Sequence, residues 1–321
     1  MRIYSNLIFI IIFVFLLSCS QETIKEVEKY ESASAEETGL YPTLNGLYAK
    51  LNTFKQNRAE QVRLFEIGRS GKLNHPIPLV RIGYNSDLSQ KRFLFIAGTH
   101  GDEAACVAAL LYSLKRILNS TLPDTLNDLQ ISADFIPVHN PDGYAENQRE
   151  NGSGLDLNRN FPFGSVRHQT VPEVEAVINL INKTEYTASL FFHSANEQKY
   201  ENLVRTPVEY QRSGLSVLNA NFSSRLTTLE KLVTAAGNAG NPDIPWHSSS
   251  DLVNVAGIAS DWCVSGYLND ANTGFTGSPC QHSHPSLTVE ICYPKQPMDE
   301  NKLQTEQQET FNIIKRIILD Y

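Results

Sequence analysis

The stretch FLFIAGTHGDE, residues 93–103, decides how the rest of this 321-residue chain is arranged. Its first five residues are apolar, as in a buried strand, and an Ala- and Leu-rich segment after it predicts a helix over 102–118. The turn between them carries His100 and Glu103, two side chains of the type that bind zinc. Ligands bind at the carboxyl ends of strands in α/β proteins, so this turn is a candidate site.

Further strands and helices alternate on both sides of this stretch. Apolar runs predict strands at 62–67, 77–82, 131–138, 188–192 and 287–292, and one-sided apolar patterns predict helices at 44–54, 172–181, within 211–236 and at 301–321. Residues 237–286 are rich in loop-forming residues. We therefore predict one α/β domain over 40–321, with a central mixed, mostly parallel sheet and helices on both faces.

The composition excludes some partners. The formal charge is -8, the pI is about 5.5, and no cluster of five or more Lys and Arg occurs. Nucleic-acid binding and attraction to anionic lipid both depend on basic patches, so neither is expected.

The N-terminus has the pattern of an export signal. Residues 7–17 form an unbroken apolar run that is too short to span a bilayer. The run ends in Leu16-Leu17-Ser18-Cys19, which resembles a bacterial lipobox. We predict a signal peptide over 1–18, a lipid on Cys19, and a solvated acidic tether over 19–39 with little order. The protein would then lie on a membrane of the cell envelope, facing the periplasm or the exterior. An uncleaved anchor and a plain secretory signal are the alternatives.

The remaining cysteines do not have the spacing of a structural zinc site. They are Cys106, Cys263, Cys280 and Cys292, and none lies in a C-x-x-C pair. Disulfides are permitted outside the cytoplasm, but the sequence does not assign a pairing.

Two more residues extend the candidate site. His193 follows the apolar strand 188–192, and with His100 and Glu103 it completes the two-His, one-Glu set of a catalytic zinc ion. Glu290 lies inside the apolar strand 287–292, where a carboxylate is costly unless it is paired or has a chemical role. We interpret Glu290 as the general base for a zinc-bound water.

The order of the motifs resembles the zinc carboxypeptidase family, and within it the bacterial murein peptide amidases. The motifs are HGDE (100–103), NPDGY (140–144), DLNRNFP (156–162), the strand-ending His193 and TVE (288–290). The resemblance implies a carboxypeptidase-like fold, one zinc ion on His100, Glu103 and His193, and Glu290 as the base. It further implies that Arg149 polarises the scissile carbonyl and that Asn158 and Arg159 hold the terminal carboxylate of the substrate.

The specificity residues of the family match less well. Asp261-Trp262 is similar to a family dipeptide and would place Ser260 at the floor of the pocket for the C-terminal side chain. In that register residues 251–254 contain no counterpart of the family's mobile Tyr. Tyr267 would be the substitute if the loop differs from that of the family. His282 and His284 are interpreted as residues of a solvated loop before the last strand, with metal binding as the alternative.

The sequence leaves the substrate open between three hydrolytic functions. The first is cleavage of cell-wall peptides at the bond between γ-D-glutamate and diaminopimelate. The others are general carboxypeptidase action on L-peptides and zinc-dependent removal of an acyl group from an amino acid, as in desuccinylases and aspartoacylases. A catalytically inactive envelope-binding protein would require a missing ligand or base, and neither is missing.

Overall fold

The computed structural model of the chain describes residues 24–32, 40–84, 89–162, 170–194, 202–205, 220–239, 246–249, 259–263, 280–291 and 300–321. Its strands are β1 (Lys25–Val27), β2 (Val62–Arg69), β3 (Pro76–Gly83), β4 (Lys91–Ile96), β5 (Ile131–Ile136), β6 (Ala188–Ser194), β7 (Asn202–Arg205), β8 (Trp246–Ser249) and β9 (Ser286–Ile291). Its helices are α1 (Leu44–Asn57), α2 (Ala104–Leu118), α3 (Leu122–Asp128), α4 (Pro141–Glu146), the 3-10 turn η1 (Leu157–Arg159), α5 (Pro172–Lys183), α8 (Ala220–Asn238), α9 (Ala259–Cys263) and α10 (Glu300–Asp320).

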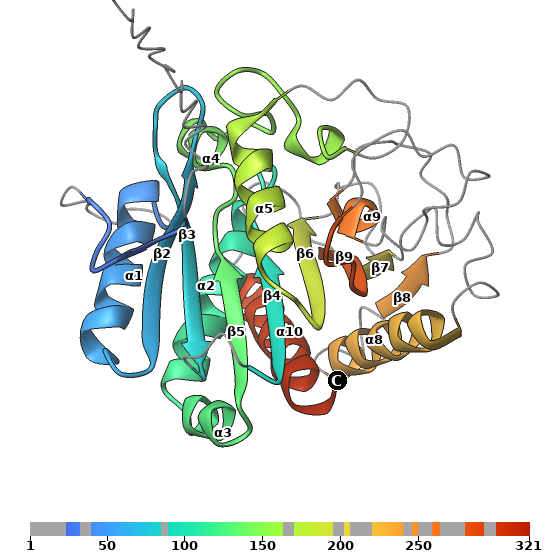
Figure 1. Cartoon of the computed structure of the whole chain (residues 1–321). Coiled ribbons are helices and arrows are strands. Elements are labelled where there is room, and N and C mark those ends of the chain that lie inside the picture. The colour runs from blue at the N-terminus through green and yellow to red at the C-terminus, as the bar shows by residue number, and fades with distance from the viewer. Residues whose placement is uncertain are drawn as a thin grey trace, which may run out of the picture.

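One mixed sheet runs through the molecule in the order β1-β2-β3-β5-β4-β6-β9-β7-β8 (Figure 1). The neighbours β5, β4, β6 and β9 are parallel, whereas β1, β2 and β3 form an antiparallel edge. The carboxyl ends of β4, β6 and β9 therefore meet at one edge of the sheet, which is where His100, His193 and Glu290 lie.

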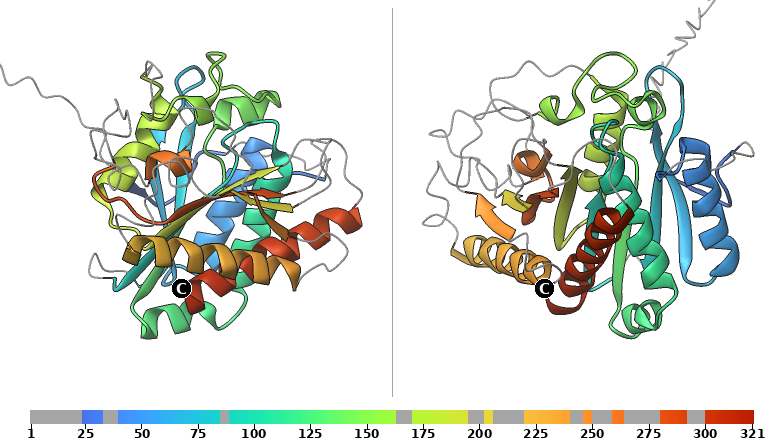
Figure 2. Two further views of the ribbon diagram at one scale, coloured as in Figure 1. Left: turned by 90° about the vertical axis from the view of Figure 1, so that its right-hand side faces the viewer. Right: turned by 180° about the vertical axis from the view of Figure 1, so that it is seen from behind.

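Helices cover both faces of the sheet, as predicted (Figure 2). Phe93 and Phe95 of β4 point into an apolar core shared with α1, α2, α3, α8 and α10, while Leu94 and Ile96 point into a second core shared with η1, α5 and α9. This alternation follows from the period of two along a strand. The α/β fold with a single mixed sheet is confirmed.

Residues 24–32, which lie within the predicted tether of little order, are ordered in the structure. Lys25–Val27 adds strand β1 to the free edge of β2, and Glu26 pairs with Arg63. Tyr30 is buried, and its hydroxyl donates to the carbonyl of Phe65 at 2.6 Å. An unpaired strand edge offers backbone groups that a neighbouring segment can pair with, so these residues are ordered against the domain.

The structure also contains short elements that were not predicted from the sequence. Short helices α4 and η1 form within 139–162, and β8 and α9 form within 237–286. None of the helices in the described part of the chain combines the length and apolar character needed to cross a membrane.

Candidate metal centre

The turn after β4 presents His100 and Glu103 because of how the backbone leaves the strand. Gly98 has a φ of +64°, a conformation that other residues adopt rarely, and Glu103 is the residue that precedes the first turn of α2. His193 comes from the parallel neighbour strand β6, which pairs Ile96 with Phe191. Adjacent parallel strands thus bring side chains from distant parts of the sequence to one point.

The three side chains form a buried cluster. His100, Glu103 and His193 are 4%, 3% and 2% exposed, and a ligand atom from each lies within 4.8 Å of those from the other two. His100 Nδ1 is 2.7 Å from Glu103 Oε1, His193 Nδ1 is 3.0 Å from Glu103 Oε2, and the two Nδ1 atoms are 3.2 Å apart. Two imidazole nitrogens and a carboxylate that converge in this way can hold a zinc ion.

The charges of the cluster are strongly coupled. Burial raises the pKa of the Glu103 carboxyl, but His193 and His100 outweigh it and hold that pKa well below its usual range. Burial lowers the pKa of His100, but the carboxylates of Glu103 and Asp156 outweigh it and raise the pKa to about 9. The site therefore stabilises the ionised form of Glu103 next to a positive charge. A bound metal ion would supply such a charge.

Asp156 was not singled out from the sequence, yet it joins two elements of the site. Its Oδ1 lies 3.3 Å from His100 Nε2 and accepts from the backbone N–H of Asn158 at 2.9 Å. Its Oδ2 accepts from Arg149 Nε at 3.1 Å and Nη2 at 2.8 Å. A histidine that binds metal usually donates its other N–H to a carboxylate. The acidic residue of the DLNRNFP segment could therefore have been predicted from the sequence as a partner of a metal-binding histidine.

Arg149 borders the cluster. Its Nη1 lies 3.3 Å from His100 Nδ1 and 4.0 Å from Glu103 Oε1. The Arg149 side chain is one-third exposed, and Asp156 holds its guanidinium through Nη2. The structure thus places a fixed positive charge beside the candidate metal ligands.

The NPDGY segment packs against the turn that carries His100 and Glu103. Gly101 and Gly143 pack backbone against backbone, and a Cβ on Gly101 would come within 2.0 Å of the Gly143 carbonyl carbon. Asn140 caps α4, with its side chain accepting from Gly143 N at 2.9 Å. Gly101 N donates in turn to the carbonyl of Arg149 at 3.3 Å.

Glu290 lies beside the cluster through the sheet register. It is the direct partner of His193 in the parallel pairing of β6 with β9, so the two side chains project from the same face. Glu290 is half-buried. A carboxylate in that position can reach a water or substrate bound next to His193.

The predicted substrate-binding residues lie on two short elements that contact each other. Asn158 and Arg159 are in η1, and Ser260 is in α9. Asn158 is buried, and its Oδ1 accepts from the backbone N–H of Ala259 at 3.1 Å, which ties η1 to α9. Ser260 is buried and its Oγ lies 2.9 Å from the hydroxyl of Thr288 on β9. Arg159 is half-buried and donates to the Asn158 carbonyl at 2.8 Å. Tyr267 and residues 251–254, like Cys19 and Cys292, lie outside the described residues.

Three other histidines, His139, His282 and His284, contact groups outside the cluster. His139 is fully buried, with Nε2 3.0 Å from the Glu173 carbonyl, and burial lowers its pKa to about 4. The prediction that His284 belongs to a solvated loop is wrong, because it is 1% exposed and its Nε2 lies 3.0 Å from Ser189 Oγ. His282 is half-buried near Glu185. Within the described ranges, the cluster of His100, Glu103 and His193 is the one group of three such residues arranged to bind a metal.

A family model described as zinc carboxypeptidase matches residues 47–313 of the chain. Carboxypeptidase SOL1 of Arabidopsis thaliana is 27% identical over 170 residues, which cover 50% of this chain and 34% of the relative. Murein peptide amidase A of Vibrio campbellii is 31% identical over 129 residues, which cover 33% of this chain and 48% of the relative. The chain thus spans less than half the length of either relative.

The fold is also similar to solved structures. Carboxypeptidase A from Helicoverpa armigera matches with a TM-score of 0.68 and 19% sequence identity, covering 86% of this chain and 72% of the other. At this identity the likeness concerns the fold.

Proposed function

The chain belongs to the zinc carboxypeptidase family, and on this premise we propose that it hydrolyses the C-terminal amide bond of a peptide with one zinc ion. The observation that carries the proposal is the convergence of His100, Glu103 and His193, with Glu290 in register beside His193. The deacylase alternative uses the same zinc set, but no feature of the described residues favours it.

The donor set fits zinc. Two neutral imidazoles and a carboxylate are the ligands that catalytic zinc ions take, and here they are buried and mutually in contact. His100 Nε2 lies 3.3 Å from Asp156 Oδ1, which favours a proton on Nε2. In the neutral imidazole that a metal requires, the lone pair of Nδ1 then faces the cluster. When bound, zinc supplies Lewis-acid polarisation of a carbonyl oxygen and of water.

Glu290 takes the proton of the attacking water and then delivers it to the leaving amine. Arg149, held by Asp156, stabilises the negative charge that develops on the carbonyl oxygen in the transition state. Asn158 and Arg159 bind the terminal carboxylate, for which an amide N–H and a guanidinium are suitable donors. The Oδ1 of Asn158 is engaged by Ala259, so the donating end of its amide is the end suited to the substrate.

For the substrate, we propose cell-wall peptides cleaved between γ-D-glutamate and diaminopimelate. The similarity to murein peptide amidase A supports this choice. The paired hydroxyls of Ser260 and Thr288 also support it, because they offer hydrogen bonds to the polar, zwitterionic end of diaminopimelate. A lipid on Cys19 and an envelope location would bring such peptides within reach, and both belong to the proposal.

A comparison of substrates tests the proposal. The purified protein is given murein tripeptide and a panel of L-peptides that differ at the C-terminus, and kcat/KM is measured for each. A hundredfold preference for L-peptides, about 2.7 kcal/mol in transition-state free energy, would exclude the murein substrate and leave the peptidase mechanism intact.

A substitution of Glu290 tests the mechanism. Glu290→Gln should keep zinc at the wild-type ratio and lose roughly 10²–10⁴-fold in kcat, because the base is lost and the ligands remain. Glu60→Gln, at an exposed position, is the matched control. Near-normal turnover of Glu290→Gln would contradict the assigned role.

A further inference from the structure

A cavity of about 450 Å³ lies away from the metal centre, at the amino ends of the central strands. Arg92 of β4, Lys183 at the end of α5, Arg225 of α8 and His282 before β9 all line it. Elements from four distant parts of the chain therefore bring basic side chains to one hollow, although the chain as a whole has a formal charge of -8.

Positive charge dominates the described lining of this basic cavity. Among its described lining residues there are two guanidinium groups and one ammonium group, and one carboxylate, that of Glu185. The side chain of Glu185 is 87% exposed and its Oε1 lies 3.7 Å from His282 Nδ1, so it extends toward solvent at the rim. Arg92, in contrast, is only 8% exposed.

Thr187 hydrogen-bonds to both arginines of the cavity. Arg92 and Thr187 are joined by two hydrogen bonds, from Thr187 N to the Arg92 carbonyl at 2.6 Å and from Arg92 N to Thr187 Oγ1 at 3.1 Å. Arg225 Nη2 donates to the Thr187 carbonyl at 2.9 Å. Arg92 Nε donates to the hydroxyl of Ser132 at 3.0 Å. Their positions are therefore set before any ligand arrives, which reduces the entropy lost on binding.

The basic cavity is remote from the metal centre. Arg92 lies at the start of β4, while His100 follows the end of that strand. A strand of this length spans about 20 Å at roughly 3.3 Å per residue. Thr187 likewise directly precedes β6, and His193 lies near the end of that strand. A ligand in the basic cavity would not compete with a substrate at the metal centre.

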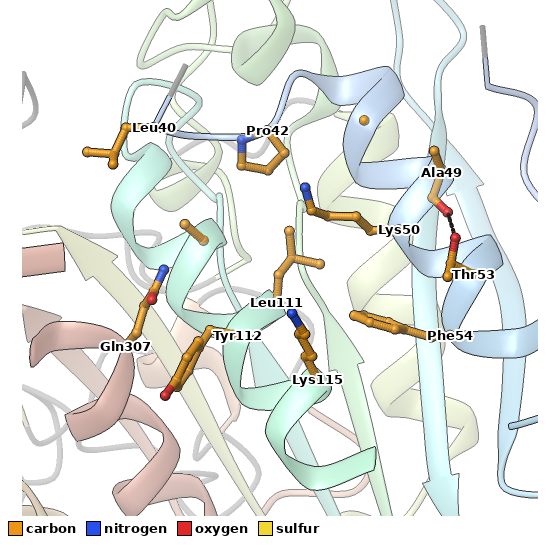
Figure 3. Close-up of a pocket in the computed structure, with 12 residues that line it drawn as sticks. Leu40, Pro42, Ala49, Lys50, Thr53, Phe54, Leu111, Tyr112, Lys115 and Gln307 are labelled. Atoms are coloured by element: carbon orange, nitrogen blue, oxygen red, sulfur yellow. Dashed lines mark hydrogen bonds between the residues drawn. The ribbon is translucent and has the colours of Figure 1, made fainter. Parts of the chain in front are cut away.

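A second hollow is also lined by basic side chains, but they are lysines among apolar residues. It has a volume of about 570 Å³ and lies between α1 and α2, where Lys50 and Lys115 sit among apolar side chains such as Phe54 and Leu111 (Figure 3). Among the described residues that line it there is no arginine. Long lysine side chains commonly extend along apolar surface in this way. The second hollow therefore serves as a control, because it carries positive charge but no arginine in its described lining.

We propose that the basic cavity binds a phosphate group. Guanidinium groups offer paired N–H donors that match the oxygens of phosphate, and the ammonium group of Lys183 adds a third positive charge. The phosphate is carried either by a free phosphomonoester, a dianion, or by a phosphodiester such as a phospholipid headgroup, a monoanion.

The test measures the thermal stability and ligand affinity of the full chain. Inorganic phosphate, glycerol 3-phosphate and glycerophosphoglycerol are titrated separately, with sodium chloride at matched ionic strength as the reference. The variants are Lys183→Gln and Arg225→Gln, singly and together, with Lys115→Gln in the second hollow as the charge-matched control. Arg225→Lys keeps the charge and removes the planar fork.

Wild type and Lys115→Gln should show a saturable rise in Tm with phosphate that sodium chloride does not produce. The double variant should lose at least tenfold in affinity, and Arg225→Lys should fall between it and wild type. Tighter binding of glycerol 3-phosphate assigns the cavity to free phosphomonoesters, and tighter binding of glycerophosphoglycerol assigns it to the diester headgroup.

Equal responses of wild type and the double variant would overturn the proposal, as would a response to sodium chloride of the same size. The variants should hydrolyse peptide at the wild-type rate. Lys183 is exposed, so Lys183→Gln keeps the test valid if Arg225→Gln unfolds through loss of its bond to Thr187.

Discussion

Replacing Asp156 with Asn should weaken zinc binding even though Asp156 is not among the proposed ligands. The substitution keeps the size of the side chain but turns one acceptor oxygen into an N–H donor. In the structure both oxygens face donors, since Oδ1 meets His100 Nε2 and Asn158 N, and Oδ2 meets two nitrogens of Arg149. Either orientation of the new amide therefore sets its NH2 group against a donor.

The expected loss follows from these contacts. Loss of the carboxylate partner of a metal-binding histidine lowers metal affinity by roughly 10–100-fold, which is about 1.4–2.7 kcal/mol. The Asp156 side chain is 19% exposed, so water replaces part of the lost interaction and the free energy of unfolding should fall by only about 1–2 kcal/mol. Turnover should fall further than zinc loss explains, because Arg149 loses its anchor.

Competition with a chromophoric chelator measures the zinc Kd, and kcat is then measured at saturating zinc. Asp124→Asn is the control, because the contact of Asp124 with Gln61 lies on the exposed surface. A zinc Kd for Asp156→Asn within twofold of the wild-type value would refute the reasoning.

Three further predictions concern packing, pH and location. Gly101→Ala should lower the free energy of unfolding by about 3 kcal/mol, because its Cβ would overlap the backbone of Gly143, and chemical denaturation would show this. Gly154→Ala, with nothing within 4 Å and a φ of +76°, should cost only about 1 kcal/mol, so equal losses would contradict the packing argument. Burial lowers the pKa of His284 to about 4, so the unfolded chain takes up a proton first as pH falls from 6.5 to 4. The folded state should lose up to about 3 kcal/mol over that window, and His284→Gln should show a shallower pH dependence. Cys19→Ala should release the protein from membranes or leave its signal uncleaved, and a processed N-terminus in an unchanged membrane fraction would contradict the anchor.

The sequence was sufficient for the features that depend on neighbours along the chain. The apolar run before His100 and the helical pattern after Glu103 predicted a strand and a helix, and both form within two residues of the expected bounds. Strand and helix periods are local properties of a chain, and a carboxylate such as Glu290 inside an apolar strand is visible without knowledge of its neighbours. Resemblance to a family then linked these motifs to one reaction.

The tertiary structure decided what depends on pairing between distant segments. The register of β6 with β9 sets Glu290 beside His193, and no local pattern specifies that register. The contacts of Asp156 with His100 and Arg149 arise where two loops meet, and the burial of His284 depends on how its turn packs against Ser189. Hydrogen bonds of this kind depend on the relative position of whole elements, which is set by packing of the two cores. The sequence therefore determined which groups the protein has for its chemistry, and the packing of the sheet and helices decided which of them act together.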